Sequence, residues 1–246
     1  MNKDFVIGVN ALQELINHAP KRILRIYTSQ EKGQGRKSEI IDSCKKKNIP
    51  VQTLPFDSLT KLVESDSHQG LVAQVHLRIY LSTKEFLQEE REKSIVLMLD
   101  QIFDPQNFGA LLRCAECFGV DAVVFSKNRG SEITPVTTKS SCGASEILPL
   151  IRVSNLAETV TEFQKAGYEA VVSILDPKSE SLNSFQFADK TLLIMGSEGE
   201  GVQPLICKRA DRSVYIPMLG KIQSLNVAQA CSVLLFKAAL ATPSRL

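Results

Sequence analysis

The chain has 246 residues, of which 43% are hydrophobic and 23% are charged, a composition typical of a globular protein with one large domain or two smaller ones. These proportions exclude long disordered or low-complexity regions. The apolar run at residues 95–99 is far too short to cross a bilayer, and no secretory signal opens the chain, so we expect a cytoplasmic protein that does not bind a membrane.

The cysteines and histidines give no sign of a metal site. Six cysteines are spread without the spacing of a disulfide framework, so we expect free thiols. Cys114 and Cys117 form a Cys-x-x-Cys pair, but they lie in an apolar helical pattern without a second pair, which favours buried structural cysteines. The three histidines, His18, His68 and His76, lie apart from the polar motifs described below.

Positive charge is concentrated in the first third of the chain. Residues 1–80 carry 12 Lys and Arg against 8 Asp and Glu, a net charge of +4, whereas residues 81–246 carry 17 against 19, a net charge of −2. The basic residues form three groups, at Lys21, Arg22 and Arg25, at Lys32, Arg36 and Lys37, and at residues 45–47. Such groups are compatible with a phosphate-binding surface and equally with solvated helix faces.

Residues 5–76 alternate between helical and strand patterns, which predicts a small α/β domain. We expect helices over residues 9–18, 37–47 and 58–64, and strands over residues 23–28, 51–54 and 71–75. A basic loop at residues 32–36 contains two glycines, which suit either a close backbone approach to a partner or a mobile surface turn. Residues 77–93 end in a run of charges and are predicted to form a linker with a short helix.

A second domain is predicted to begin at Ser94 and to extend to residue 246. Its predicted strands cover residues 95–99, 122–125, 170–175, 192–195 and 214–216, separated by helices over residues 110–118, 156–165, 204–209 and 227–240. Apolar strands that alternate with helices indicate a parallel sheet buried on both faces. Ligands are then expected at the loops beyond the carboxyl ends of the strands.

A polar loop, residues 100–113, follows the first strand of this domain. Pro105 and Gly109 shape the turn, and Asn107 is predicted to cap a helix, which would place Arg113 on the first turns of that helix, facing the sheet edge. An arginine there can hold a phosphate or a reacting oxygen, although taken alone it favours a surface ion pair.

Two further segments follow later strands. Residues 195–201 have the order Gly-x-x-Gly-x-Gly, which allows close backbone approach but matches neither the dinucleotide fingerprint nor a P-loop; alone, it predicts a tight turn before a helix. Residues 216–226 leave a strand and reach Ser224 and Asn226, which in isolation would be helix-capping side chains.

Taken together, the three segments resemble the three sequence motifs of the SpoU (TrmH) family of RNA ribose methyltransferases, in the knotted SPOUT superfamily. The matching pieces are Asp104-Pro-x-Asn107-x-Gly109 with Arg113, Met195-Gly-Ser-Glu-Gly-Glu-Gly201, and Ile216-Pro-Met with Ser224-Leu-Asn-Val227. Residues 5–76 look like the small, ribosomal-protein-like RNA-binding domain that precedes the catalytic domain in one branch of the family.

Two other stretches indicate a particular branch. Lys139-x-Ser141-x-Gly143-Ala144-x-Glu146 and Arg152-Val-Ser-Asn-Leu156 are similar to the branch that methylates a guanosine in the peptidyl-tRNA-binding loop of 23S rRNA. The resemblance implies an α/β fold with a deep trefoil knot, in which the chain from about residue 191 onward passes through an earlier loop. Because true knots are very rare in protein folds, general rules of chain topology alone would have excluded such a knot.

The resemblance also implies how the site is built. S-adenosylmethionine would lie bent in the knot, held by backbone groups of Gly196, Ile216 and Leu225. Arg113 would be the catalytic residue. Because a guanidinium is almost never neutral in proteins, two versions stay open: Arg113 loses its proton to an RNA phosphate, or it stays cationic and stabilises the forming oxyanion. The residues that would orient Arg113, the ribose and the cofactor are Asn107, Glu198, Ser224 and Asn226.

The function predicted from the sequence is S-adenosylmethionine-dependent methylation of a guanosine ribose 2′-hydroxyl in 23S rRNA or its precursor particle, without a metal. The alternatives are a tRNA guanosine 2′-O-methyltransferase of the same family, an RNA-binding paralogue without catalysis, and a nucleotide-dependent α/β enzyme. Arg113 and Glu198 argue against the second, and the missing nucleotide fingerprints argue against the third. The apolar last helix, residues 227–240, together with the resemblance, predicts a homodimer through the C-terminal domain.

Overall fold

The computed structural model describes residues 4–29, 35–197 and 199–241, and the chain forms two compact units. The first unit combines Met1–Ile79 with Ile133–Ile147, and the second combines Tyr80–Glu132 with Leu148–Leu246. The segment Ile133–Ile147 therefore packs with the N-terminal residues, although in sequence it lies within the predicted second domain.

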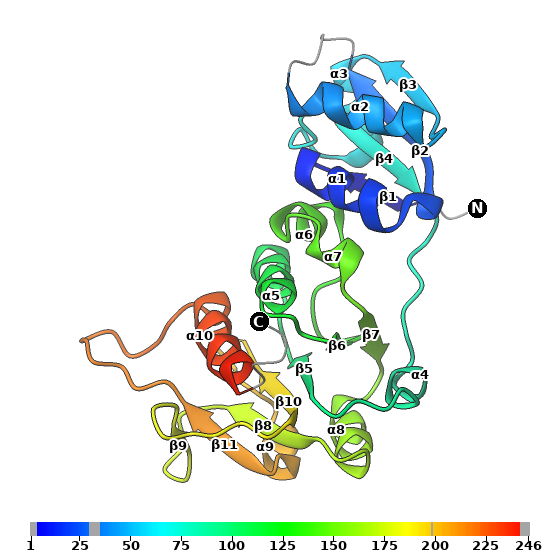
Figure 1. The fold of residues 1–246 in the computed structure, drawn as a ribbon. Coiled ribbons are helices and arrows are strands. Elements are labelled where there is room, and N and C mark those ends of the chain that lie inside the picture. Colours follow the sequence, from blue (N-terminus) through cyan, green and yellow to red (C-terminus); the bar gives the residue numbers. More distant parts are fainter. Residues whose placement is uncertain (1–3, 30–34, 198, 242–246) are drawn as a thin grey trace. The chain divides into compact units, whose positions relative to one another are not determined.

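The first unit contains a four-stranded sheet with the strand order β1-β4-β2-β3 (Figure 1). Its strands are β1 (Asp4–Ile7), β2 (Ile23–Ser29), β3 (Val51–Leu54) and β4 (Leu71–Val75). Strand β4 pairs antiparallel with both β1 and β2, and β2 pairs parallel with β3. All residues of β4 are buried because it lies inside the sheet and is covered on both faces.

Helices α1 (Val9–His18), α2 (Arg36–Lys46) and α3 (Phe56–Val63) cover this sheet. Apolar side chains of α1 and α2 form one cluster with β2 and β4, and Leu59 of α3 joins a second cluster with Ile7 and Val72. The helices and strands predicted for this region are confirmed, to within two residues at each end. Strand β1 was not predicted, since four residues carry too short a pattern to distinguish a strand from the helix that follows.

Two short helices of the first unit come from the middle of the sequence and were not predicted. They are α6 (Pro135–Ser140) and α7 (Ala144–Ile147), and both contact α1. Gly143 lies between them with a φ of +93°, and a Cβ there would come within 2.9 Å of the Glu14 side chain. Glycine is thus required both for the backbone conformation and for the close approach to α1.

A carboxylate buried between two arginines fixes α7 in this unit. The Glu146 side chain is fully buried and accepts hydrogen bonds from the guanidinium groups of Arg22 and Arg78 and from Ser145 Oγ. Arg22 Nε also donates to the carbonyl oxygen of His76 at 3.1 Å. Burial lowers the pKa of the Arg22 guanidinium. Arg22 therefore pairs with Glu146 and is not a member of an exposed phosphate-binding group.

His68 is another buried polar side chain of the first unit, and its burial predicts that the stability of the protein depends on pH. Its Nδ1 accepts from the Gly70 amide at 3.0 Å, and its Nε2 lies 3.0 Å from Thr60 Oγ1. Burial lowers the pKa of His68. The unfolded chain therefore binds a proton more readily than the folded one, so stability should fall as the pH drops through about 6.5 towards the lower folded pKa.

Urea unfolding of the wild type and of His68→Asn at pH 8.0, 6.5 and 5.5 measures this effect. The wild type should lose stability relative to the variant on acidification, because Asn cannot take up the proton. A constant difference between the two proteins across this range would show that His68 does not contribute to the pH dependence.

The second unit contains a seven-stranded sheet with the order β7-β6-β5-β10-β8-β11-β9, and every strand pair in it is parallel. Its strands are β5 (Ser94–Leu99), β6 (Ala122–Ser126), β7 (Leu150–Val153), β8 (Glu169–Ser173), β9 (Glu180–Ser181), β10 (Lys190–Met195) and β11 (Arg212–Tyr215). The predicted parallel sheet is confirmed. The short edge strands β7 and β9 were not predicted.

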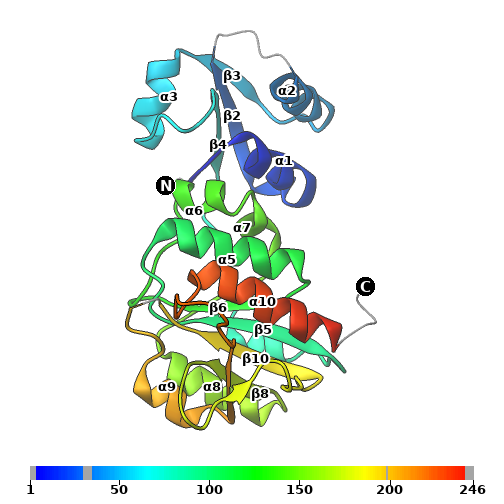
Figure 2. The ribbon, with the colours of Figure 1, turned by 90° about the vertical axis from the view of Figure 1, so that its left-hand side faces the viewer.

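Helices cover both faces of this sheet. Figure 2 shows α5 (Pro105–Cys117) and α10 (Val227–Leu240) on one face, and α8 (Leu156–Lys165) and α9 (Pro204–Arg209) on the other. All six residues of β5 are buried, because alternate side chains point into the two layers. The predicted short helix, α4 (Thr83–Leu87), is also present, and its Phe86 packs into the core beside α8.

All six cysteines are thiols without a disulfide bond, as predicted. Burial raises the pKa of the Cys44 thiol to about 11 and raises that of Cys231 well above its usual value, so both stay protonated at neutral pH. The prediction that Cys114 and Cys117 are both buried is wrong, since Cys117 is exposed and Cys114 is half-buried beside Ser232. In the described parts of the chain no helix has the length and apolarity needed to span a membrane.

Candidate active site

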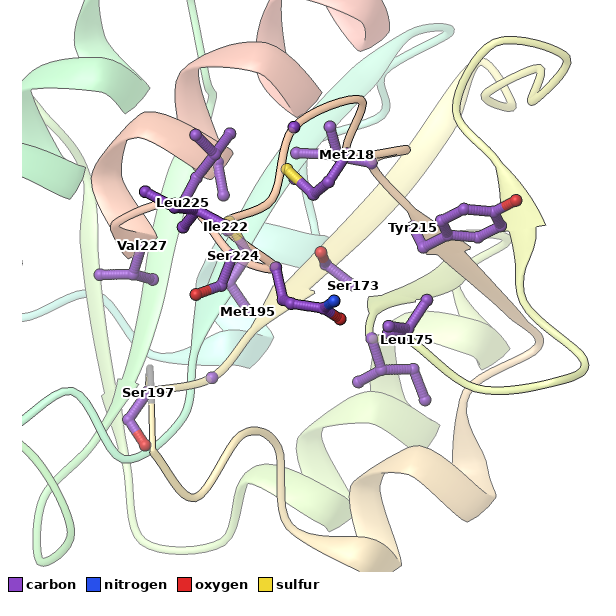
Figure 3. Close-up of a pocket in the computed structure, with 16 residues that line it drawn as sticks. Ser173, Leu175, Met195, Ser197, Tyr215, Met218, Ile222, Ser224, Leu225 and Val227 are labelled. Atoms are coloured by element: carbon purple, nitrogen blue, oxygen red, sulfur yellow. The ribbon is translucent and has the colours of Figure 1, made fainter.

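A cavity of about 470 Å³ opens at the carboxyl ends of β8, β10 and β11, where a parallel sheet is expected to bind its ligand. Figure 3 shows the side chains that surround it, from these strand ends and from the loop that leads to α10. The lining residues are Ser173–Leu175, Met195–Ser197, Tyr215, Ile216, Met218, Gly220, Ile222–Leu225, Val227 and Ala230. The cavity brings together four residues that were predicted for the site: Gly196, Ile216, Ser224 and Leu225.

Gly196 and Gly201 of the glycine-rich segment approach each other closely beside the cavity. A Cβ at Gly196 would lie 2.0 Å from the carbonyl oxygen of Gly201, so only glycine lets these two residues meet. The Gly201 amide donates to the Ser197 carbonyl at 3.1 Å, and Gly201 has a φ of +69°. The close approach of Gly201 therefore requires glycine at position 196, whatever binds in the cavity. Gly196 also lines the cavity.

The cavity wall is uncharged and its mouth is apolar. None of the described residues that line it carries a charge, and Leu175 and Ile222 at its edge are 77% and 79% exposed. Large apolar side chains exposed beside a pocket are typical of a surface that a ligand or partner covers. Sequence reasoning missed the contributions of Ser173 and Leu175, because their pattern indicated only a strand, and it gave no role to Met218 of the third motif.

Helix α5 begins differently from the prediction. Asp104, rather than Asn107, caps the helix: its carboxylate accepts from the backbone amides of Gln106 and Asn107, each at 3.1 Å. Pro105 is the first helical residue, as expected for proline. Asn107 is the third residue of the helix, in its first turn, and its side chain is therefore available for another contact.

That contact is with Asn226, the residue that caps α10. Asn226 Nδ2 donates to Asn107 Oδ1 at 3.0 Å, while Asn226 Oδ1 accepts from the Ala228 amide at 2.9 Å. One side chain therefore caps α10 and joins its start to the start of α5. Two of the predicted site residues, distant in sequence, therefore meet directly. The predicted capping role of Asn226 is confirmed, and its role in the reaction stays a prediction.

Arg113 lies further along α5 than predicted. It is in the third turn of the helix and is exposed, so its predicted place on the first turns is wrong. The next residue, Cys114, faces Ser232 of α10 with its Sγ 2.9 Å from the serine Oγ, so this stretch of α5 packs against α10. Glu198 lies outside the described residues.

The sequence matches two protein-family models, one over each end of the chain. The model of the SpoU rRNA methylase family matches residues 94–236, and a model described as RNA 2′-O ribose methyltransferase substrate binding matches residues 5–81. Among similar solved structures is the SpoU methyltransferase AviRb from Streptomyces viridochromogenes in complex with the cofactor AdoMet. It has a TM-score of 0.79 and 22% identity, and the match covers 98% of this chain and 91% of AviRb.

Curated relatives resemble the chain over nearly its full length. The 23S rRNA (guanosine-2′-O-)-methyltransferase RlmB of Pasteurella multocida is 33% identical over 94% of this chain and 96% of its own. RlmB of Pseudomonas putida is 34% identical over 95% of this chain and 94% of its own. From the family match and these full-length relatives, we conclude that the chain belongs to the SpoU rRNA methylase family.

Proposed function

We propose that this protein transfers the methyl group of S-adenosylmethionine to the ribose 2′-hydroxyl of a guanosine in 23S rRNA, in its peptidyl-tRNA-binding loop. The observation that carries the proposal is the full-length likeness to RlmB proteins, combined with a cavity on which the second and third motifs meet. The protein acts in the cytoplasm and needs no metal, because the sulfonium of the cofactor is already a good leaving group.

The residues of the cavity fit S-adenosylmethionine. Its volume of about 470 Å³ is within the usual range for small-molecule sites, and its uncharged wall suits an adenine ring. Backbone groups of Gly196, Ile216 and Leu225 would hold the cofactor, and the exposed side chains of Leu175 and Ile222 would cover it. When bound, the cofactor supplies a methyl group activated by the sulfonium.

The chain would reach this cavity through a deep trefoil knot that starts at about residue 191. The strand order supports the knot. Strand β10 lies between β5 and β8, so the last quarter of the chain enters the middle of a sheet whose neighbouring strands precede it in sequence. The structural likeness to AviRb over 98% of the chain supports the same family fold.

Arg113 would stabilise the oxyanion that forms when the 2′-hydroxyl attacks. A hydroxyl is a weak nucleophile at neutral pH, and a guanidinium offers five N–H donors in a fixed fork. Asn107, Glu198, Ser224 and Asn226 would orient the ribose and the arginine. The hydrogen bond between Asn226 and Asn107 would hold the starts of α5 and α10 together. The ribose and the cofactor would then be positioned for reaction, which contributes to the rate.

Residues 1–76 would form the RNA-binding domain, residues 77–93 the linker and residues 94–246 the catalytic domain, apart from Ile133–Ile147, which groups with the first unit. The first unit exposes several basic side chains, those of Lys21, Arg25, Arg36 and the lysines at 45–47. Such side chains bind RNA phosphates without recognising the base sequence. Lys32 and most of the predicted basic loop lie outside the described residues. Specificity would then come from the shape of the RNA hairpin and from a guanosine that leaves its stack.

The experiment that tests this function compares two RNA substrates. Purified protein is incubated with methyl-labelled S-adenosylmethionine and either a 23S rRNA fragment that contains the peptidyl-tRNA-binding loop or total tRNA. We expect the rRNA fragment to be labelled and tRNA to remain near background. If tRNA were the better substrate, the alternative of a tRNA guanosine 2′-O-methyltransferase would replace the proposal.

We also propose a homodimer through the second unit. Val233, Phe236 and Leu240 of α10 are 41–55% exposed, and the Phe236 ring lies against Phe118 beside α5, so a continuous apolar face remains uncovered. A second copy would bury this face by the hydrophobic effect. Light scattering at micromolar concentration should give twice the mass of the chain, and a monomer mass would overturn the proposal.

A further inference from the structure

A second cavity, of about 320 Å³, lies at the carboxyl ends of β6 and β7. Buried Leu156 and Ile206 contribute to its apolar part, whereas Asn128, Arg129 and Asn155 contribute polar groups. None of the described residues that line it is acidic, so the one charged residue among them gives the cavity a positive character. This combination of apolar surface, amide groups and a guanidinium suits a nucleobase.

The loop that forms this cavity packs against the first motif. The Ser131 amide donates to the carbonyl oxygen of Ile102 at 2.6 Å, and a Cβ at Gly130 would lie 3.3 Å from the same oxygen. In the sheet, β5 lies between β6 and β10. The loop that leads from β5 to Asn107 and Arg113 is therefore flanked by this cavity on one side and by the cofactor cavity on the other.

Hydrogen bonds hold Arg129 in place and connect it to the strand ends of the active site. Arg129 Nη1 donates to Gln203 Oε1 at 2.8 Å. Gln203 in turn donates to both carboxylate oxygens of buried Asp100, from its side chain at 2.7 Å and from its backbone amide at 2.8 Å. The Asp100 amide donates to Met195, the residue before Gly196, at 2.9 Å. Arg129 is an exposed side chain whose guanidinium is oriented by this chain of hydrogen bonds.

We infer that this cavity binds the guanine base of the methylated guanosine and that Arg129 is a specificity-determining residue. The inference rests on the proposed function, since it assumes an RNA guanosine whose ribose reacts at the neighbouring first motif. An arginine fork pairs with guanine through O6 and N7, a contact that other bases do not offer in the same way. The ribose of a base held there would lie beside the loop that carries Asn107.

If Arg129 contacts the guanine N7, removing either the arginine or N7 should abolish the same contact. The substrate is the 23S rRNA fragment with either guanosine or 7-deazaguanosine at the methylated position. Arg129→Ala should lower kcat/KM about tenfold or more on the guanosine RNA, because a bidentate contact is worth about 1–3 kcal/mol. On the 7-deazaguanosine RNA, which already lacks N7, the same substitution should cost much less.

The controls separate this role from folding, charge and the proposed function. Lys127→Ala removes a positive charge from the same loop, at an exposed residue that does not line the cavity, and should leave the ratio between the two RNAs unchanged. Calorimetry with S-adenosylmethionine should give wild-type affinity for Arg129→Ala, and Arg129→Lys, which lacks the fork, should not restore the preference for guanosine.

Equal losses on both RNAs, or full rescue by lysine, would overturn the inference and assign Arg129 to general attraction of the backbone. If the wild type failed to methylate the guanosine RNA at all, the proposed function itself would fail, which is a different result.

Discussion

The Arg113→Ala variant is expected to fold and to bind S-adenosylmethionine like the wild type, while methyl transfer falls by a factor of roughly 10² to 10³ or more. Removing one oxyanion-stabilising donor has an effect of this size in other enzymes. Arg113 is exposed on the third turn of α5, and the core contacts of that helix are made by Leu111, Leu112 and Ala115, so the substitution leaves its packing intact.

Two measurements on Arg113→Ala separate chemistry from binding. Calorimetry with S-adenosylmethionine reports the cofactor site, and a single-turnover methyl-transfer assay with saturating rRNA reports the chemical step. Arg113→Lys is the matched variant: it keeps the charge but loses the planar fork and should recover only a small part of the rate. Appreciable turnover by a well-folded Arg113→Ala would remove Arg113 from the mechanism.

Glu146→Ala is expected to destabilise the first unit by about 3–5 kcal/mol, because it leaves the guanidinium groups of Arg22 and Arg78 poorly solvated and without their carboxylate. The two arginine side chains are only 15% and 11% exposed, so water cannot replace the lost partner fully. Hydrogen exchange should show faster opening of α6 and α7 first, since Glu146 holds them to the N-terminal elements.

A matched control for Glu146 lies in the same unit. Asp42 and Lys45 form an ion pair on α2 whose side chains are 58% and 70% exposed, and Asp42→Ala should cost no more than about 1 kcal/mol. Urea unfolding of both variants measures the difference. If Glu146→Ala lost no more stability than Asp42→Ala, the buried cluster would not be what attaches α7 to the first unit.

The regular elements of the fold could be predicted where the hydrophobic pattern is long. The parallel strands β5, β6, β8 and β10 are continuous apolar runs, and α10 has 14 residues of helical pattern. The packing of Ile133–Ile147 with the first unit could not be predicted. Glu146 contacts Arg22 and Arg78, which lie 124 and 68 residues away in sequence, and no local sequence pattern predicts a contact over such separations.

The candidate site could be predicted only in part from its residues. Single segments indicated caps and turns, and only the three together, through their resemblance to a family, pointed to a cofactor site. The capping role of Asn107 was wrong because Asp104, three residues earlier, competes for the same amides. Arg129 and Gln203 gave no signal, since their link to Asp100 depends on strand order rather than on sequence spacing.

The most direct test of the central claim is a map of ribose methylation in RNA from a strain that lacks this protein, compared with the same strain carrying the wild type or Arg113→Ala. We expect one 2′-O-methylguanosine in the peptidyl-tRNA-binding loop of 23S rRNA to disappear, to return with the wild type and to stay absent with Arg113→Ala. An unchanged 23S rRNA map, or a loss confined to tRNA, would contradict the account.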